Sequence, residues 1–162
     1  MSTYNGECLI ANFIKEKVEN PRIDDFEWEK FKEIKDGTLT DEQSNVLKIL
    51  CENNIAFLDS PAGCGKSSTM MAVIQMMEYY HKTYTCLCPT GKSSARLTEQ
   101  TGRPCSTIHK ATMNGTITTD YLIVDEDSFL SIELMCMIIN AIENENMKLL
   151  FIGDSMQLPP LS

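Results

Sequence analysis

The stretch of sequence that decides the fold reads Ile55-Ala56-Phe57-Leu58-Asp59-Ser60-Pro61-Ala62-Gly63-Cys64-Gly65-Lys66-Ser67. Its first four residues are apolar, which is typical of a strand buried on both faces. Sequence with a helical pattern follows, from Lys66 to about Tyr80. A strand, a glycine-containing loop and a helix in this order form the setting of a phosphate-binding P-loop. The stretch therefore predicts a site for the phosphates of a nucleotide.

The chemistry of this loop depends on its glycines and on the start of the following helix. Glycines let backbone N–H groups turn toward phosphate oxygens, and the helix N-terminus adds the positive end of its dipole. Lys66 can reach the β- and γ-phosphates, and the Ser67 hydroxyl can bind Mg²⁺. Ser60 stands where the consensus has glycine, and an ordinary strand-to-helix turn is the alternative interpretation. The predicted ATP-binding residues of the loop are Ser60, Pro61, Ala62, Gly63, Cys64, Gly65, Lys66, Ser67 and Ser68.

A pair of acids follows a second apolar run about sixty residues downstream. Residues 121–124 are predicted to form a strand beside the P-loop strand, and Asp125 and Glu126 come directly after it. A carboxylate there can hold the Mg²⁺ of bound ATP, directly or through water, which is the predicted role of Asp125. Glu126 can orient or deprotonate the attacking water. Alone this acidic strand end is a weak signal, but together with the P-loop it predicts an NTPase.

A third polar loop follows the last apolar run, at residues 149–152. It reads Gly153-Asp154-Ser155-Met156-Gln157-Leu158-Pro159-Pro160. The amide of Gln157 can hydrogen-bond a γ-phosphate oxygen and respond to its loss. Taken alone, the segment is also typical of a polar turn that ends in prolines.

The remaining pattern predicts a parallel sheet with helices on both faces. Thr40 to Gln43 form a capping box that opens a helix to about Asn53. A strand is predicted at 84–88, a helix near 92–100 that Gly102 closes, and another helix at 129–142. Alternating strands and helices indicate an α/β fold with three layers, around a mainly parallel sheet. The first 38 residues predict two short helices with a packing or protein-contact role, so the chain divides into a helical extension, 1–38, and a nucleotide-binding domain, 39–162.

The composition excludes several other classes of protein. A chain of 162 residues with 43% hydrophobic and 23% charged residues is neither collagenous nor disordered. The absence of a long apolar run and of a basic, then apolar, start predicts no membrane span and no secretory signal. The seven cysteines form no CxxC pair, so they are predicted to be reduced thiols. The expected location is the cytoplasm, or the DNA-containing compartment of an infected cell if the protein is viral.

The charge pattern predicts a local contact with nucleic acid. The chain has a formal net charge of -9, so it does not bind polyanions as a whole. Residues 82–110 reverse this balance with five basic residues and one acid, while nine basic and twenty-two acidic residues lie elsewhere. Hydroxyls, a lysine and a predicted helix start within Pro89 to Ser94 suit the phosphates of a DNA backbone. An ordinary solvated helix face is the alternative interpretation.

These segments together resemble the first motor domain of superfamily 1B DNA helicases, the RecD/Dda-like group of RecA-like P-loop motors. The resemblance rests on TDEQ, SPAGCGKS, CPTGKSSARL, STIH, DEDS and GDSMQLPP, in this order from about residue 39 to residue 160. It implies that Gln43 reads the adenine, that Ser60 to Ser67 form the Walker A motif and that Asp125 and Glu126 form Walker B. It also implies that Gln157 couples the γ-phosphate to the DNA site. It further implies that Thr90 and the segment Thr107 to His109 contact single-stranded DNA, although a lone histidine is also typical of a structural role. With the basic segment, the predicted DNA contacts are Pro89, Thr90, Lys92, Arg96, Thr107 and His109.

The function that the resemblance implies is that of an ATP-dependent, 5′→3′ DNA helicase that uses ATP and Mg²⁺. The sequence stops just after the segment that contains Gln157. We therefore expect a truncated or split form whose second RecA-like half is missing and is supplied in cis or in trans. The isolated chain is then expected to bind ATP but to be weakly active or inactive. A PhoH-like P-loop ATPase and a nucleotide- or DNA-binding module without turnover remain the two alternatives.

Overall fold

A parallel sheet forms the middle layer of the molecule. The computed structural model describes residues 3–23, 28–34, 39–59, 66–113, 115–126 and 131–153. Within these residues the sheet has five strands in the order β1-β5-β4-β2-β3, and all neighbouring pairs are parallel. The strands are β1 (Ile55–Asp59), β2 (Tyr84–Cys88), β3 (Ser106–Thr107), β4 (Tyr121–Glu126) and β5 (Lys148–Gly153).

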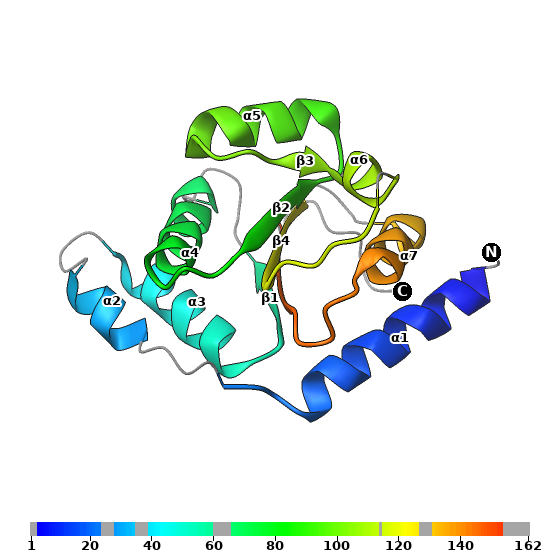
Figure 1. The fold of residues 1–162 in the computed structure, drawn as a ribbon, viewed down its shortest axis with the longest axis horizontal. Coiled ribbons are helices and arrows are strands. Elements are labelled where there is room, and N and C mark those ends of the chain that lie inside the picture. The colour runs from blue at the N-terminus through cyan, green and yellow to red at the C-terminus, as the bar shows by residue number, and fades with distance from the viewer. Residues whose placement is uncertain are drawn as a thin grey trace.

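Helices cover both faces of the sheet, so the fold has the three layers that the sequence predicts (Figure 1). One face packs against α3 (Asp41–Glu52), α4 (Lys66–Tyr79) and α5 (Gly91–Thr101), with α2 (Trp28–Ile34) outside α3 and α4. The other face packs against α1 (Thr3–Glu19), α6 (Ile108–Met113) and α7 (Ile132–Ala141). Neither α6 nor β3 was predicted from the sequence, because each is too short to show a period. None of the described helices is long and apolar enough to cross a membrane.

The two N-terminal helices pack onto the sheet domain. Ile10, Phe13 and Ile14 of α1 lie against the cluster that contains α7. Lys17 is buried, and its ammonium donates to the backbone carbonyls of Glu145 and Met147, at 3.0 and 2.6 Å. The helices α1 and α2 therefore contribute packing to the described fold, and the domain boundary at residue 38 stays a prediction.

The predicted start of α3 and the predicted end of α5 are both present in the structure. The Thr40 hydroxyl accepts from the Gln43 N–H at 3.1 Å, and the Gln43 side-chain carbonyl accepts from the Thr40 N–H at 3.0 Å. This reciprocal pair is a complete capping box at the start of α3. Gly102 ends α5 in the left-handed conformation, with φ of 68°, where a side chain on any other residue would be strained.

Phe57 of β1 departs from the prediction of a strand that is buried on both faces. Ile55 and Ala56 are buried, whereas Phe57 is 60% exposed. Its ring stacks on Phe151 of the neighbouring β5, with centroids 5.1 Å apart and 13° between planes. The reason is position, since β1 pairs only with β5 among the described strands. An apolar run does not distinguish an edge strand from a central one.

Candidate functional site

Three loops with predicted chemistry leave the sheet at the same edge. In the parallel register Asp59 of β1 lies beside Gly153 of β5, and Gly153 lies beside Glu126 of β4. The carboxyl ends of these three strands therefore lie next to one another, at the edge where ligands bind in open α/β sheets. The prediction that the strand before Asp125 lies beside the P-loop strand is wrong, because β5 lies between β1 and β4. β5 still belongs to the site, since the Gln157 loop follows it.

The P-loop helix begins at Lys66, as predicted. Residues 60–65 and Gln157 lie outside the described residues, and the side chains of Lys66 and Glu126 also lie outside them. Ser67, in the first turn of α4, is half-buried, and its hydroxyl donates to the Gln100 side-chain carbonyl of α5 at 2.7 Å. This bond leaves the lone pairs of the Ser67 oxygen able to accept or to bind a metal ion.

A pocket of about 440 Å³ lies beside this helix start and brings predicted residues together. The predicted adenine-reading Gln43 from α3 lines it together with Ser67 and Ser68 from α4. Because the Gln43 carbonyl already accepts the capping hydrogen bond, its NH₂ group is the part suited to donate to a ligand. The capping and ligand roles of Gln43 are thus compatible. The remaining lining residues are Leu39, Met71, Ala72, Gln75 and Gln100.

Asp125 is the buried carboxylate of the candidate site. It is 2% exposed and follows Tyr121 and Ile123 at every second position of β4. Those two residues belong to the cluster on the α3–α4–α5 side, so the Asp125 side chain lies on the face that α4 covers. Among the described residues no group of three or more His, Cys, Asp or Glu is arranged to hold a metal. One serine and one aspartate fit Mg²⁺, which takes few protein ligands and completes its shell with phosphate oxygens and water.

The predicted DNA-contacting residues gather at the carboxyl ends of β2 and β3. Pro89 and Thr90 follow β2 directly, and Thr107 of β3 pairs with Cys88, the last residue of β2. Lys92 and Arg96 are exposed on α5 one turn apart, so they share a face of that helix. His109 is exposed on α6. The structure thus places the six predicted residues around the β2–β3 end of the sheet: two follow β2, one ends β3, and the others lie on α5 and α6, which cover opposite faces.

Two of these residues also stabilise helix ends. The Thr90 hydroxyl accepts from the Ser93 N–H at 3.1 Å and caps α5. The Thr107 hydroxyl accepts from the Lys110 N–H at 3.1 Å at the start of α6. Substitution of either threonine would change the stability of a helix end as well as any contact with phosphate. The lysine and arginine of α5 are therefore the cleaner probes of DNA binding.

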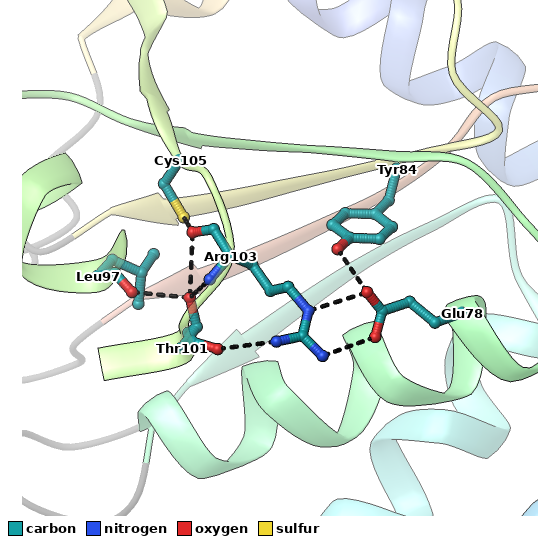
Figure 2. A network of polar contacts seen from close by, with 6 residues as sticks. All are labelled: Glu78, Tyr84, Leu97, Thr101, Arg103 and Cys105. Atoms are coloured by element: carbon teal, nitrogen blue, oxygen red, sulfur yellow. Dashed lines mark hydrogen bonds and ion pairs between the residues drawn. The ribbon is translucent and has the colours of Figure 1, made fainter. Parts of the chain in front are cut away.

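Arg103 belongs to a polar network rather than to an open basic surface (Figure 2). Its guanidinium donates to both carboxylate oxygens of Glu78, at 2.9 and 3.0 Å, and the Tyr84 hydroxyl donates to the same carboxylate at 3.1 Å. The hydrogen bonds from Arg103 lower the pKa of Glu78. Burial, with the bond to Glu78, raises the pKa of Tyr84 to about 12. The basic segment therefore presents less positive charge than its sequence indicates.

Gln75 and Gln100 were not among the predicted site residues. Both line the pocket with Ser67, and Gln100 contacts Ser67 directly. Gln100 lies 33 residues from Ser67 in the sequence, near the end of a helix for which the sequence predicts DNA contact or a solvated face, and not a part in the nucleotide site. No local pattern marks such a residue, because its role depends on how α5 packs beside α4.

Comparison with known proteins agrees with this arrangement. The family model described as an AAA domain, AAA_30, matches residues 38–162. The ATP-dependent RecD2 DNA helicase of Deinococcus radiodurans is 32% identical over 169 residues, covering 96% of this chain and 23% of that protein. An uncharacterized protein of Methanocaldococcus jannaschii, MJ1519, is 30% identical over 183 residues, covering 94% of this chain and 15% of that protein. The chain thus spans less than a quarter of the length of either relative.

A solved structure gives the same result for the fold. The crystal structure of Pif1 helicase from Candida albicans aligns with a TM-score of 0.51 and 22% identity, over 76% of this chain and 34% of that one. At this identity the likeness concerns the fold alone.

Proposed function

The chain belongs to the AAA_30 family of AAA domains and carries a RecD/Pif1-like helicase motor fold of superfamily 1, and we propose that it binds Mg·ATP at the start of α4. The observation that carries the proposal is the pocket in which Gln43 of α3 meets Ser67 and Ser68 of α4. An amide donor on one wall and two hydroxyls at a helix N-terminus on the other suit a purine at one end and phosphates at the other. The pocket volume of about 440 Å³ is within the usual range for small-molecule sites.

Each proposed residue has one task in the reaction. Lys66 neutralises charge on the β- and γ-phosphates. Ser67 and Asp125 would hold Mg²⁺, which would offset the charge that develops on the phosphates. Glu126 orients and deprotonates the attacking water at the end of β4, and Gln157 contacts the γ-phosphate. Most of the rate enhancement would come from positioning and electrostatic stabilisation.

Turnover distinguishes this motor from a binding module. In the purified chain, with a second RecA-like half supplied, we expect Glu126→Gln to keep ATP binding and to lower hydrolysis by about 10²- to 10⁴-fold, because the amide cannot accept the proton. Glu133→Gln, on the exposed side of α7, is the matched control and should leave the rate unchanged. A wild-type chain that binds ATP and never hydrolyses it, even with a second RecA-like half supplied and over a long single-turnover incubation, would instead indicate the non-catalytic module.

Single-stranded DNA is the proposed second ligand, at the edge of the sheet formed by β3 and next to the exposed face of α5. Lys92 and Arg96 carry positive charge on one exposed face of α5, and phosphate contacts of this kind carry no base information. We propose that ATP hydrolysis drives 5′→3′ translocation along this strand. Strand separation then requires a second RecA-like domain, in the same polypeptide or from a partner.

The DNA proposal is tested by the salt dependence of binding. Loss of two phosphate contacts in Lys92→Ala/Arg96→Ala should weaken binding to unrelated single strands equally, and should reduce the slope of log K against log salt by about 1.4. The control is Lys30→Ala/Lys48→Ala, which removes the same charge from exposed positions on α2 and α3. Equal effects of the two variants would show that net charge, and not this surface, sets the affinity.

A further inference from the structure

Two cysteines lie side by side on neighbouring strands, next to but outside the nucleotide pocket. The parallel register pairs Leu87 with Ser106 and Cys88 with Thr107, and the same register extended by one residue places Cys86 beside Cys105. Neighbouring strands are about 4.7–4.9 Å apart, which is within the Cα separation of about 4.4–6.8 Å that a disulfide spans.

The two side chains also lie on the same face of the sheet. Cys86 is a buried member of the cluster on the α3–α4–α5 side, and Cys105 packs against that same cluster. Each thiol lies close enough to the other to shift its pKa. Together with the strand register and the shared face, this places the pair for a bond between the two sulfur atoms.

Their surroundings divide the chemistry between them. Cys86 is 3% exposed, while Cys105 is half-buried, and both line a groove of about 700 Å³ with Ser94, Thr107 and Lys110. The hydrogen bond from Cys86, helped by Thr98 and Thr101, lowers the pKa of Cys105. The hydrogen bond to Cys105, together with burial, raises the pKa of Cys86. Because the thiolate is the attacking species, Cys105 is the nucleophile and Cys86 is the thiol that reacts second.

The loop that carries Cys105 is held in place by its own polar contacts. The Thr101 hydroxyl donates to the Leu97 carbonyl at 2.8 Å and accepts from the Arg103 N–H at 3.2 Å, and Arg103 is bound to Glu78 (Figure 2). The Cys105 thiol lies 3.7 Å from the Arg103 carbonyl oxygen. This support keeps the Cys105 sulfur beside Cys86 and at the wall of the groove.

We propose that Cys105 is a site of thiol modification and that Cys86 resolves the adduct into an intramolecular disulfide. With oxidised glutathione as the reagent, the Cys105 thiolate attacks one sulfur, forms a mixed disulfide and releases one glutathione thiolate. The Cys86 thiol then loses its proton, attacks the Cys105 sulfur and releases the second glutathione. The two protein thiols lose two electrons and two protons in total, and the glutathione disulfide is reduced to two thiols.

The experiment maps disulfides in the full chain after incubation with oxidised glutathione, in a Cys8→Ser background because Cys8 is exposed. Digestion with trypsin under non-reducing conditions should link peptide 83–92 to peptide 97–110, since Pro104 protects the Arg103 bond from cleavage. The intact protein should lose two titratable thiols and two hydrogen atoms in mass, with no glutathione retained.

Matched variants identify the sulfurs involved. Cys88 shares a peptide with Cys86, so Cys88→Ser should keep the link, whereas Cys86→Ser or Cys86→Ala should abolish it and leave glutathione attached to Cys105. Cys105→Ser should prevent both the link and the adduct within residues 83–110. Cys136→Ser, at a buried position of α7 on the opposite face of the sheet, is the control and should change nothing.

Three results would overturn the proposal. They are a stable glutathione adduct on Cys105 in the Cys8→Ser chain without a link, a link that uses Cys88, and modification of other cysteines while Cys105 stays reduced. The mapping of the Cys8→Ser chain decides among these outcomes even where a substitution at the buried Cys86 prevents folding.

Discussion

The hydrogen bond between Ser67 and Gln100 should affect how tightly ATP binds in the presence of Mg²⁺. The Ser67 hydroxyl donates to the Gln100 carbonyl oxygen at 2.7 Å, which fixes its proton and leaves the oxygen lone pairs for the metal. Gln100→Ala frees the hydroxyl to rotate and removes this orientation. Because alanine is the best helix former and Gln100 is exposed on α5, the fold should persist.

The size of the effect follows from the single bond that is lost. A net hydrogen bond contributes about 0.5–1.5 kcal/mol, so ATP affinity in the presence of Mg²⁺ should fall by about 2- to 12-fold. ATP affinity measured in EDTA should change less, because without Mg²⁺ the orientation of the Ser67 hydroxyl no longer affects metal binding. Titration of a fluorescent ATP analogue with Mg²⁺ and with EDTA gives the ratio of the two affinities for each variant.

Gln75→Ala is the matched control for this measurement. Gln75 lines the same pocket as Gln100, so its loss should affect binding with and without Mg²⁺ alike. An unchanged ratio of the two affinities in Gln100→Ala would refute the orienting role. Tighter Mg·ATP binding in that variant would refute it as well, since it would mean that Gln100 competes with the ligand for Ser67.

Three further predictions concern the described fold. Lys148 is fully buried, and its ammonium donates to two carbonyls in the last turn of α3, at 3.1 and 2.7 Å. Lys148→Met should therefore lower the free energy of unfolding, measured in urea, by about 1–3 kcal/mol. A variant at least as stable as the wild type would contradict this. The pKa of Tyr84 is raised to about 12, so its contribution to stability is present below pH 10 and is lost as the pH rises toward 12. The difference in absorbance at 295 nm between the wild type and Tyr84→Phe should show this ionisation near pH 12. A midpoint near pH 10 would count against the network. Because the pKa of Glu78 is lowered, its contribution to stability is present above the ordinary carboxyl pKa and is lost as the pH falls through the lowered value. In Glu78→Gln the free energy of unfolding should therefore fall less steeply as the pH is lowered through the acid range. The same acid dependence in the variant and the wild type would contradict this.

The elements with strong local signals were predicted well from the sequence. The capping box at Thr40 and Gln43 fixed the start of α3, and the glycine at 102 fixed the end of α5. The comparisons confirm the helicase-like family that the ordered motifs indicate. These features succeed because each depends on residues that are close together in the chain.

The features that were missed depend on contacts between distant parts of the chain. The exposure of Phe57 follows from the place of β1 in the sheet, and the insertion of β5 between β1 and β4 follows from strand order. From the sequence alone, a lysine at position 148 is expected on the surface. In the fold its ammonium donates to the carbonyls at the end of α3, which has no basic residue of its own in its last turn.

The central claim is that the start of α4 binds the phosphates of Mg·ATP, and calorimetric titration of Lys66→Ala against the wild type tests it most directly. A charge-assisted contact contributes about 1.5–3 kcal/mol, so the account predicts a loss of affinity of about 10- to 150-fold. Lys48→Ala, an exposed lysine on α3, should bind Mg·ATP as the wild type does. Affinity in Lys66→Ala equal to that of the wild type would contradict the assignment of this loop and helix as the nucleotide site.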